Sequence, residues 1–155
     1  MTNIIKFLSD EIMVILIAAM PVLELRGAIP FGVSLGMHPL HAMVLGILGS
    51  MLPVPFLLLF LKPVFREMRK HRLFKRFVEW VTHRTMKKAT NIKKYSALGL
   101  LIFVAVPLPT TGVWTGSIAA ALLDMRFRTG FFAILAGNCI AALIMMLLSH
   151  AAFGF

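Results

Sequence analysis

The chain has 155 residues, of which 59% are hydrophobic and only 14% are charged, and its formal net charge is +10. Soluble domains carry about 25% charged residues, so this composition excludes an ordinary soluble domain. It predicts an all-α integral membrane protein with a single transmembrane domain over residues 1–155. The length allows at most about five spans of ~20 residues.

Four apolar blocks follow one another along the chain, and two of them are broken. Prolines, glycines and polar residues interrupt the first block, 12–36, and the third, 96–123. Their unbroken stretches of about ten residues extend only ~15 Å as helix, which is too short for ~30 Å of hydrocarbon. Each broken block is therefore either one kinked span or a re-entrant hairpin that leaves by the face it entered. The second block, 41–61, and the fourth, 130–155, lack Lys, Arg, Asp and Glu and can span.

Twelve of the sixteen Lys and Arg residues lie between Lys62 and Lys94. The positive-inside bias makes this segment a cytoplasmic loop of an inner-membrane protein rather than a nucleic-acid site. Within it, 64–81 is expected to form a basic amphipathic helix, lying either on anionic lipid or in solvent. If both broken blocks are hairpins, Arg126 and Arg128 are also cytoplasmic. If every block spans, these two arginines fall outside, so the hairpin topology is favoured.

The two halves, 1–61 and 95–155, share a pattern on either side of the basic linker 62–94. Each contains a bent tip, a short apolar half-helix, a polar break and a spanning block. The expected tip or hinge residues are Pro21, Gly27, Pro30, Pro107, Pro109 and Gly112. In the hairpin topology the halves have opposite orientations. They then form an inverted repeat with tips meeting at mid-membrane, which is a transporter design.

Glu24 and Arg26 are charged residues inside the first broken block. A charge at the bilayer centre costs at least ~2.5 kcal/mol, so such residues are functional candidates. Burial disfavours the charged form of a carboxylate and a nearby guanidinium favours it, which makes Glu24 the candidate proton carrier. Residues i and i+2 of a helix do not face each other, so a direct pair requires a non-helical backbone. The alternative is that both charges only satisfy loop backbone and each other.

Thr110 and Thr111 precede Gly112 at the second tip. Hydroxyls and free N–H groups beside a half-helix N-terminus suit an anion. Equally, the threonines can cap the following helix. The chain has no nucleophile–base arrangement, phosphate-binding glycine loop or zinc spacing. We therefore expect neither an enzyme nor a bound cofactor or metal.

Asp124, Arg126 and Arg128 follow the second half-helix. The arginines can bind a phosphate head group, with Asp124 pairing with either of them. Alternatively they are topology charges at the membrane edge. Asn138, in the fourth block, is expected to hydrogen-bond another helix, and Cys139 is expected to be a buried thiol.

The runs 21–30 and 106–116 resemble the "putative small multidrug export" proteins of bacteria and archaea, which are distantly similar to the DedA superfamily. The resemblance covers nearly the whole chain. It implies two opposed re-entrant hairpins, a dimer, and proton-coupled translocation of lipids such as polyprenyl phosphate. It also implies that Glu24 is the acidic tip residue and that Arg126 or Arg128 is a functional arginine. A second acidic residue usual in the first hairpin is absent, because 32–36 contains none.

We therefore expect a multi-pass transporter that moves an anionic lipid or similar amphipath, polyprenyl phosphate or a phospholipid, with protons. Glu24 would carry the proton, Arg26 would orient the tip, and Arg126 would attract the head group. The expected partners are membrane lipid, the small amphipathic substrate and a second copy of the chain. Export of cationic drugs, with Glu24 as the cation partner, is one alternative. A non-transporting membrane scaffold is the other.

Overall fold

The computed structural model describes residues 2–68, 92–107 and 111–153, and every regular element within these ranges is a helix. The all-α class is thereby confirmed over the described residues. In chain order the helices are α1 (Thr2–Ala19), α2 (Glu24–Ser34), α3 (Pro39–Met51), α4 (Val54–Met68), α6 (Ile92–Ala105), α7 (Val113–Leu122) and α8 (Phe127–Phe153). The expected amphipathic helix 64–81 falls partly in α4, and its remainder lies outside the described residues.

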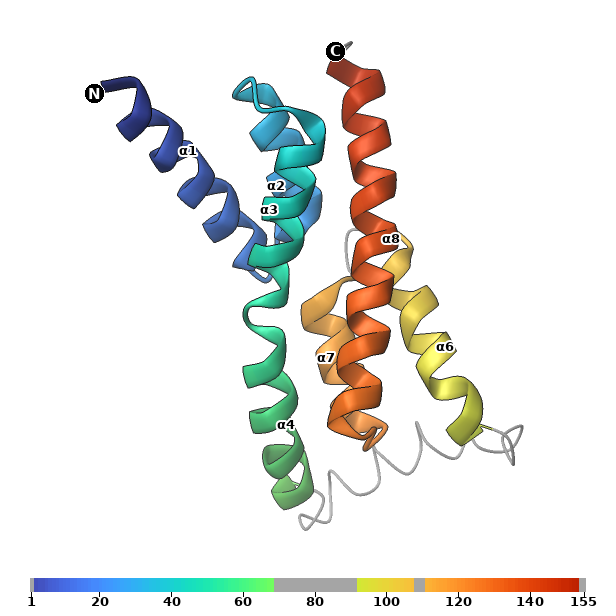
Figure 1. Ribbon diagram of the computed structural model, residues 1–155. Helices are drawn as coiled ribbons and strands as arrows, with labels where there is room; N and C mark the ends of the chain where they lie inside the picture. The colour runs from blue at the N-terminus through green and yellow to red at the C-terminus, as the bar shows by residue number, and fades with distance from the viewer. Residues whose placement is uncertain (1, 69–91, 108–110, 154–155) are drawn as a thin grey trace.

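The first half consists of a hairpin and a long helical element. In Figure 1, α1 runs from the N-terminus to the middle of the molecule, and α2 returns beside α3 to the end where α1 began. The bend is short, because the backbone N–H of Glu24 already donates to the carbonyl of Met20 at 3.1 Å. One apolar cluster holds the hairpin against α3, and its buried members are Val14, Ala18, Ala28, Val33, Met37 and Ala42.

α3 and α4 continue one another from that end to the opposite end of the molecule (Figure 1). α3 stops at Met51 and α4 starts at Val54, with Pro53 between them. A proline has no N–H to donate to the preceding turn, so it interrupts the helix here. Together the two helices form one long, predominantly apolar element, Pro39–Glu67.

The second half repeats this order from the other end. In Figure 1, α6 rises to the middle, α7 returns, and α8 then extends along the whole molecule to the C-terminus. α8 has 27 residues, or ~40 Å of helix. α6 packs on α8, and α7 packs on α4. The buried residues between them include Leu58, Leu100, Val104, Val113 and Ile134.

Each of the two hairpins ends in a turn of the same type. The N–H of Met37 donates to the carbonyl of Gly32 at 3.1 Å, and the N–H of Met125 donates to that of Ala120 at 3.0 Å. The residues before these methionines, Gly36 and Asp124, have φ values of 85° and 49°. This backbone pattern is the left-handed helix C-cap that ends many helices. The turns therefore correspond at a spacing of 88 residues.

Each half also contains one very close helix contact. A Cβ built at Gly49 would lie 2.5 Å from the carbonyl oxygen of Ile15, and one at Gly137 would lie 2.5 Å from that of Leu101. Because only glycine permits this approach, α1 meets α3, and α6 meets α8, at matched positions. Gly49 and Gly137 are again 88 residues apart.

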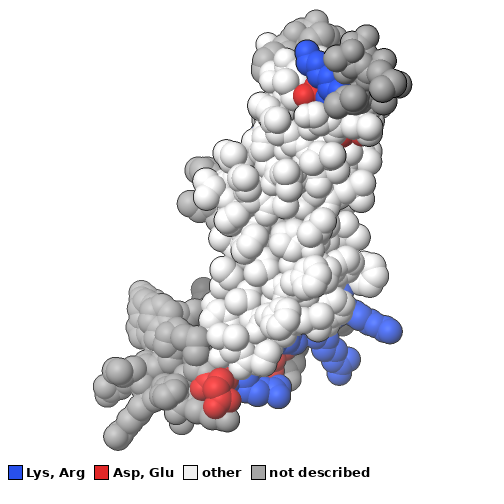
Figure 2. Space-filling model, turned by 90° about the vertical axis from the view of Figure 1, so that its left-hand side faces the viewer, with Lys and Arg blue, Asp and Glu red and all other residues white. Residues whose placement is uncertain are grey.

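The face of the molecule shown in Figure 2 is free of charged side chains between its two ends. Figure 2 shows Lys, Arg, Asp and Glu gathered at the two ends, with uncoloured residues between them. Large apolar side chains are exposed, including Phe56, Phe60, Phe132 and Leu147, which are 56–67% exposed. Pro39–Glu67 and Phe127–Ala152 are long and apolar enough to cross a membrane. Cys139 is exposed, so the expectation that it is buried is wrong.

Candidate functional site

Glu24 is the first residue of α2 and faces the second hairpin. Its φ is 49°, in the left-handed region that non-glycine residues seldom adopt. The residue is only 6% exposed. Such a conformation costs about 1–3 kcal/mol and persists where surrounding contacts hold it. The bend of the first hairpin therefore places one carboxylate in the interior of the molecule.

The carboxylate of Glu24 lies at the N-terminus of α7. Oε2 accepts the backbone N–H of Val113 at 3.3 Å, and Oε1 accepts that of Trp114 at 3.1 Å. The first N–H groups of a helix have no partner within the helix and carry partial positive charge. Glu24 thus caps α7 from the other hairpin, in the position where helix N-termini bind anions.

Gly112 makes this approach possible. A Cβ built at Gly112 would lie 1.7 Å from Oε2 of Glu24 and 2.4 Å from its Cδ. Gly112 precedes α7 and has no side chain of its own to cap the helix. Any larger residue would occupy the volume of the carboxylate.

Arg26 binds the end of the neighbouring helix, α6. Its Nη2 donates to the carbonyl of Val106 at 2.9 Å and to Oγ1 of Thr111 at 3.0 Å. Oγ1 of Thr111 in turn donates to the same Val106 carbonyl at 2.6 Å. A helix C-terminus carries partial negative charge, so a guanidinium is favourable there. Nε of Arg26 is buried and has no hydrogen-bond partner among the described residues.

The two tips are therefore joined by complementary charges, and we call this set of bonds the tip contact. The acid caps the start of α7 and the base caps the end of α6. A further bond is donated by the second hairpin to the first, since Nε1 of Trp114 donates to the carbonyl of Ala19 at 3.1 Å. Glu24 and Arg26 form no ion pair with each other in the described structure, because each binds the second hairpin instead.

The remaining residues expected at the tips do not all lie in the bends. Pro21 lies in the bend after α1, whereas Gly27 and Pro30 lie inside α2, because the bend is complete by residue 23. Pro107 follows the end of α6. Thr110 and Pro109 lie outside the described residues.

Asp124, Arg126 and Arg128 lie at the far end of α7, in the turn to α8 and in its first residues. α7 has 10 residues, so about 15 Å of helix separates this group from the tip contact. Oδ1 of Asp124 lies 3.8 Å from Nζ of Lys62 on α4. The structure therefore does not bring these arginines to Glu24, and Asp124 pairs with a lysine of the first half.

One hydrogen bond in the interior connects the halves beyond the tips. Nδ2 of Asn138 donates to Oγ of Ser50 at 2.8 Å, which confirms the expected interhelical bond. Ser50 and Asn138 are 88 residues apart, the same spacing as that between the two turns and the two glycine contacts. Trp114, two residues after Gly112, was expected either to pack on this tip or to contact a lipid tail, and its hydrogen bond to Ala19 agrees with the first of these.

Comparison with known proteins identifies one family. The model of the family described as "Putative small multi-drug export protein" matches residues 24–144, which begin at Glu24 and include the second tip. No curated protein and no solved structure matches the chain. The expected similarity to DedA proteins stays a prediction. The family match and the two long apolar helices together identify a membrane protein.

Proposed function

The chain belongs to the small multi-drug export family, and from this premise we propose that it is a membrane transporter whose tip contact is the gate. We propose that its substrate is an anionic amphipath, such as a lipid with a phosphate head group, and that protons move with it. The observation that carries this proposal is the position of Glu24. Its carboxylate occupies an anion-binding helix N-terminus where the two hairpins meet.

The proposed topology has two re-entrant hairpins in an inverted repeat. α2 and α7 have 11 and 10 residues, so neither crosses ~30 Å of hydrocarbon. The matched turns, the matched glycine contacts and the Ser50–Asn138 bond support a repeat with a common spacing of 88 residues. The basic end, which carries Arg126 and Arg128, is assigned to the cytoplasm by the positive-inside bias.

Protonation of Glu24 is the proposed coupling step. A neutral carboxyl binds N–H donors less strongly than a carboxylate does, because bonds to charged groups are about twice as strong. A proton on Glu24 therefore releases the N–H groups of Val113 and Trp114. These groups can then donate hydrogen bonds to an anionic head group. The buried Nε–H of Arg26 supplies a further donor. Proton and anion enter together because the anion restores, at the α7 N-terminus, the negative charge that the proton removes from Glu24.

Loss of the Glu24 bonds also weakens the contact between the hairpins. With Glu24 neutral, the remaining bonds between the tips come from Arg26 and Trp114. In transporters with inverted repeats, movement of one repeat against the other exposes a central site to alternate sides of the membrane. The tip contact is central in the molecule (Figure 1), so its opening and closing would serve this role.

The test is proton-driven movement of a fluorescent anionic lipid in vesicles containing the purified protein. Glu24→Gln keeps the size of the side chain and removes the charge, and we expect it to abolish the response to a pH gradient. Asp10→Asn is the matched control, because it removes a carboxylate from the same hairpin away from the tip. Undiminished, gradient-dependent transport by Glu24→Gln would contradict the proposal.

Export of amphipathic cations is the second candidate, and the family description favours it. In that mechanism the Glu24 carboxylate would pair with the cation after leaving the α7 N-terminus. Uptake of a lipophilic cation such as ethidium, measured in the same vesicles, separates the two candidates. Movement of the cation without movement of the anionic lipid would select export. If neither probe moves, the result would favour a non-transporting membrane scaffold.

A further inference from the structure

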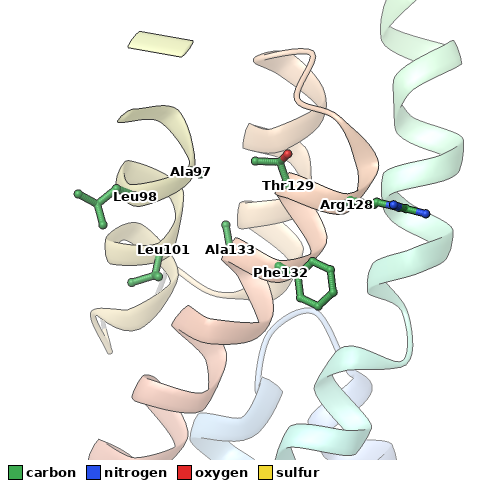
Figure 3. A pocket seen from close by; sticks show the side chains of 7 residues that line it. All are labelled: Ala97, Leu98, Leu101, Arg128, Thr129, Phe132 and Ala133. Carbon is green, nitrogen blue, oxygen red and sulfur yellow. The ribbon is translucent and has the colours of Figure 1, made fainter. Parts of the chain in front are cut away.

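A shallow groove runs between α6 and α8 at the basic end of the molecule. Its volume is about 540 Å³, and its lining residues are Ala97, Leu98, Leu101, Arg128, Thr129, Phe132 and Ala133. Figure 3 shows the α6 residues on one side and the α8 residues on the other, with Phe132 and Arg128 on the flank nearer α4. The groove is open to the surroundings of the protein, and except for Arg128 and Thr129 its lining is apolar.

A bond between two side chains crosses the same location in the first half. The matched contacts align α1 with α6 at a spacing of 86 residues, from Ile15 and Leu101, and α3 with α8 at 88. Ala97 then corresponds to Glu11, and Thr129 corresponds to His41. Nε2 of His41 lies 2.7 Å from Oε1 of Glu11, which ties α1 to α3. The second half has two small side chains there instead, so α6 and α8 lack the corresponding bond.

The chemistry of the groove fits one occupant. Leu98, Leu101 and Phe132 provide an apolar surface on a flank that would face hydrocarbon, since Leu98 and Phe132 are 53% and 63% exposed. Arg128 is exposed at the end nearest the basic linker and forms no ion pair with another described residue. An arginine at this level can bind a phosphate bidentately while the chain lies along the apolar wall.

We propose that this groove binds an acyl chain of an anionic glycerophospholipid from the surrounding bilayer, with its phosphate on Arg128. The site is distinct from the tip contact, which lies at the other end of α7. Its role rests on the proposed function: the groove is the lateral access site through which the substrate leaves the cytoplasmic leaflet. The Glu11–His41 bond closes the equivalent route in the first half.

The experiment uses the full chain in nanodiscs of phosphatidylcholine and phosphatidylglycerol, each lipid supplied in turn with a photoreactive diazirine in its acyl chain. Adducts are mapped by peptide mass spectrometry. We expect phosphatidylglycerol adducts to concentrate on 97–101 and 129–133. Arg128→Gln should reduce them about fivefold, as expected for one cation beside an anionic lipid. Arg66→Gln, which removes a charge from the same end outside the groove, should leave them unchanged.

A second pair of variants tests the shape of the groove. Ala97→Phe fills it and should remove the adducts of both lipids, whereas Ala151→Phe adds the same bulk on an exposed part of α8 and should not. If Ala97→Phe fails to fold, Arg128→Gln still provides the test. Equal labelling by the two lipids in the wild type, or adducts spread evenly along α8, would overturn the proposal.

Transport separates this inference from the proposed function. We expect Glu24→Gln to lose transport and to keep groove labelling, since the groove is away from the tip. Undiminished transport by folded Ala97→Phe would refute the access role and leave the tip mechanism standing. Selective labelling without any wild-type flux would refute the transporter and support the lipid site.

Discussion

Replacement of Gly112 by alanine tests the tip contact directly. Gly112 has φ 166° and ψ −164°, an extended conformation that any residue adopts. The substitution therefore introduces no backbone strain. Its added methyl group would lie 1.7 Å from Oε2 of Glu24, whereas non-bonded carbon atoms approach to about 3.5 Å. The carboxylate must move by about 2 Å, which breaks its bonds to Val113 and Trp114.

The magnitude follows from those two bonds. A hydrogen bond to a charged group contributes about 1.5–3 kcal/mol. Loss of both predicts a decrease of roughly 3–6 kcal/mol in the free energy of unfolding, at the upper end of single-mutation effects. Gly99→Ala is the matched control, because a Cβ at Gly99 has no neighbour within 4 Å and the site is exposed on α6. It should stabilise the protein by about 0.5–1 kcal/mol through helix propensity.

The assay is reversible unfolding in mixed micelles, followed by the loss of helical circular dichroism. A double-mutant cycle assigns the effect to Glu24. In a Glu24→Ala background the obstructing carboxylate is gone, so Gly112→Ala should cost less by about 3 kcal/mol, a large coupling energy. An equal cost in both backgrounds, or a wild-type-like Gly112→Ala protein, would refute the contact between the tips.

Two further predictions use the same unfolding assay. Trp114→Phe retains an aromatic ring and loses the N–H bond to Ala19, so it should destabilise the protein by about 1 kcal/mol. An unchanged free energy of unfolding would mean that the indole nitrogen is not bonded there. Asn138→Leu loses the bond to Ser50 and should cost about 0.6 kcal/mol, the average for interhelical bonds in membranes. That cost should disappear in a Ser50→Ala background, and its persistence would show that Asn138 has another role.

The local properties of the chain were decided by the sequence. The apolar composition determined the membrane class, because a charged fraction of 14% leaves most of the surface without polar groups. Prolines, glycines and polar residues broke two blocks into stretches too short to span, and the structure has a bend in each block, although α2 begins at Glu24 and runs through Gly27 and Pro30. Glu24 and Arg26 were recognisable as site residues because charges within apolar sequence are costly.

The partners of those charges were decided only by the tertiary structure. Every residue except proline carries a backbone N–H and a carbonyl, so sequence cannot show which helix end approaches a given side chain. The interpretation from sequence expected the two tips to meet, but only the structure shows that Glu24 caps the start of α7 and Arg26 binds the end of α6. Gly112 became meaningful in the same way, since its missing side chain matters only because Glu24 fills that space. Helix ends have direction and polarity, but only the packing of the two hairpins determines which ends meet.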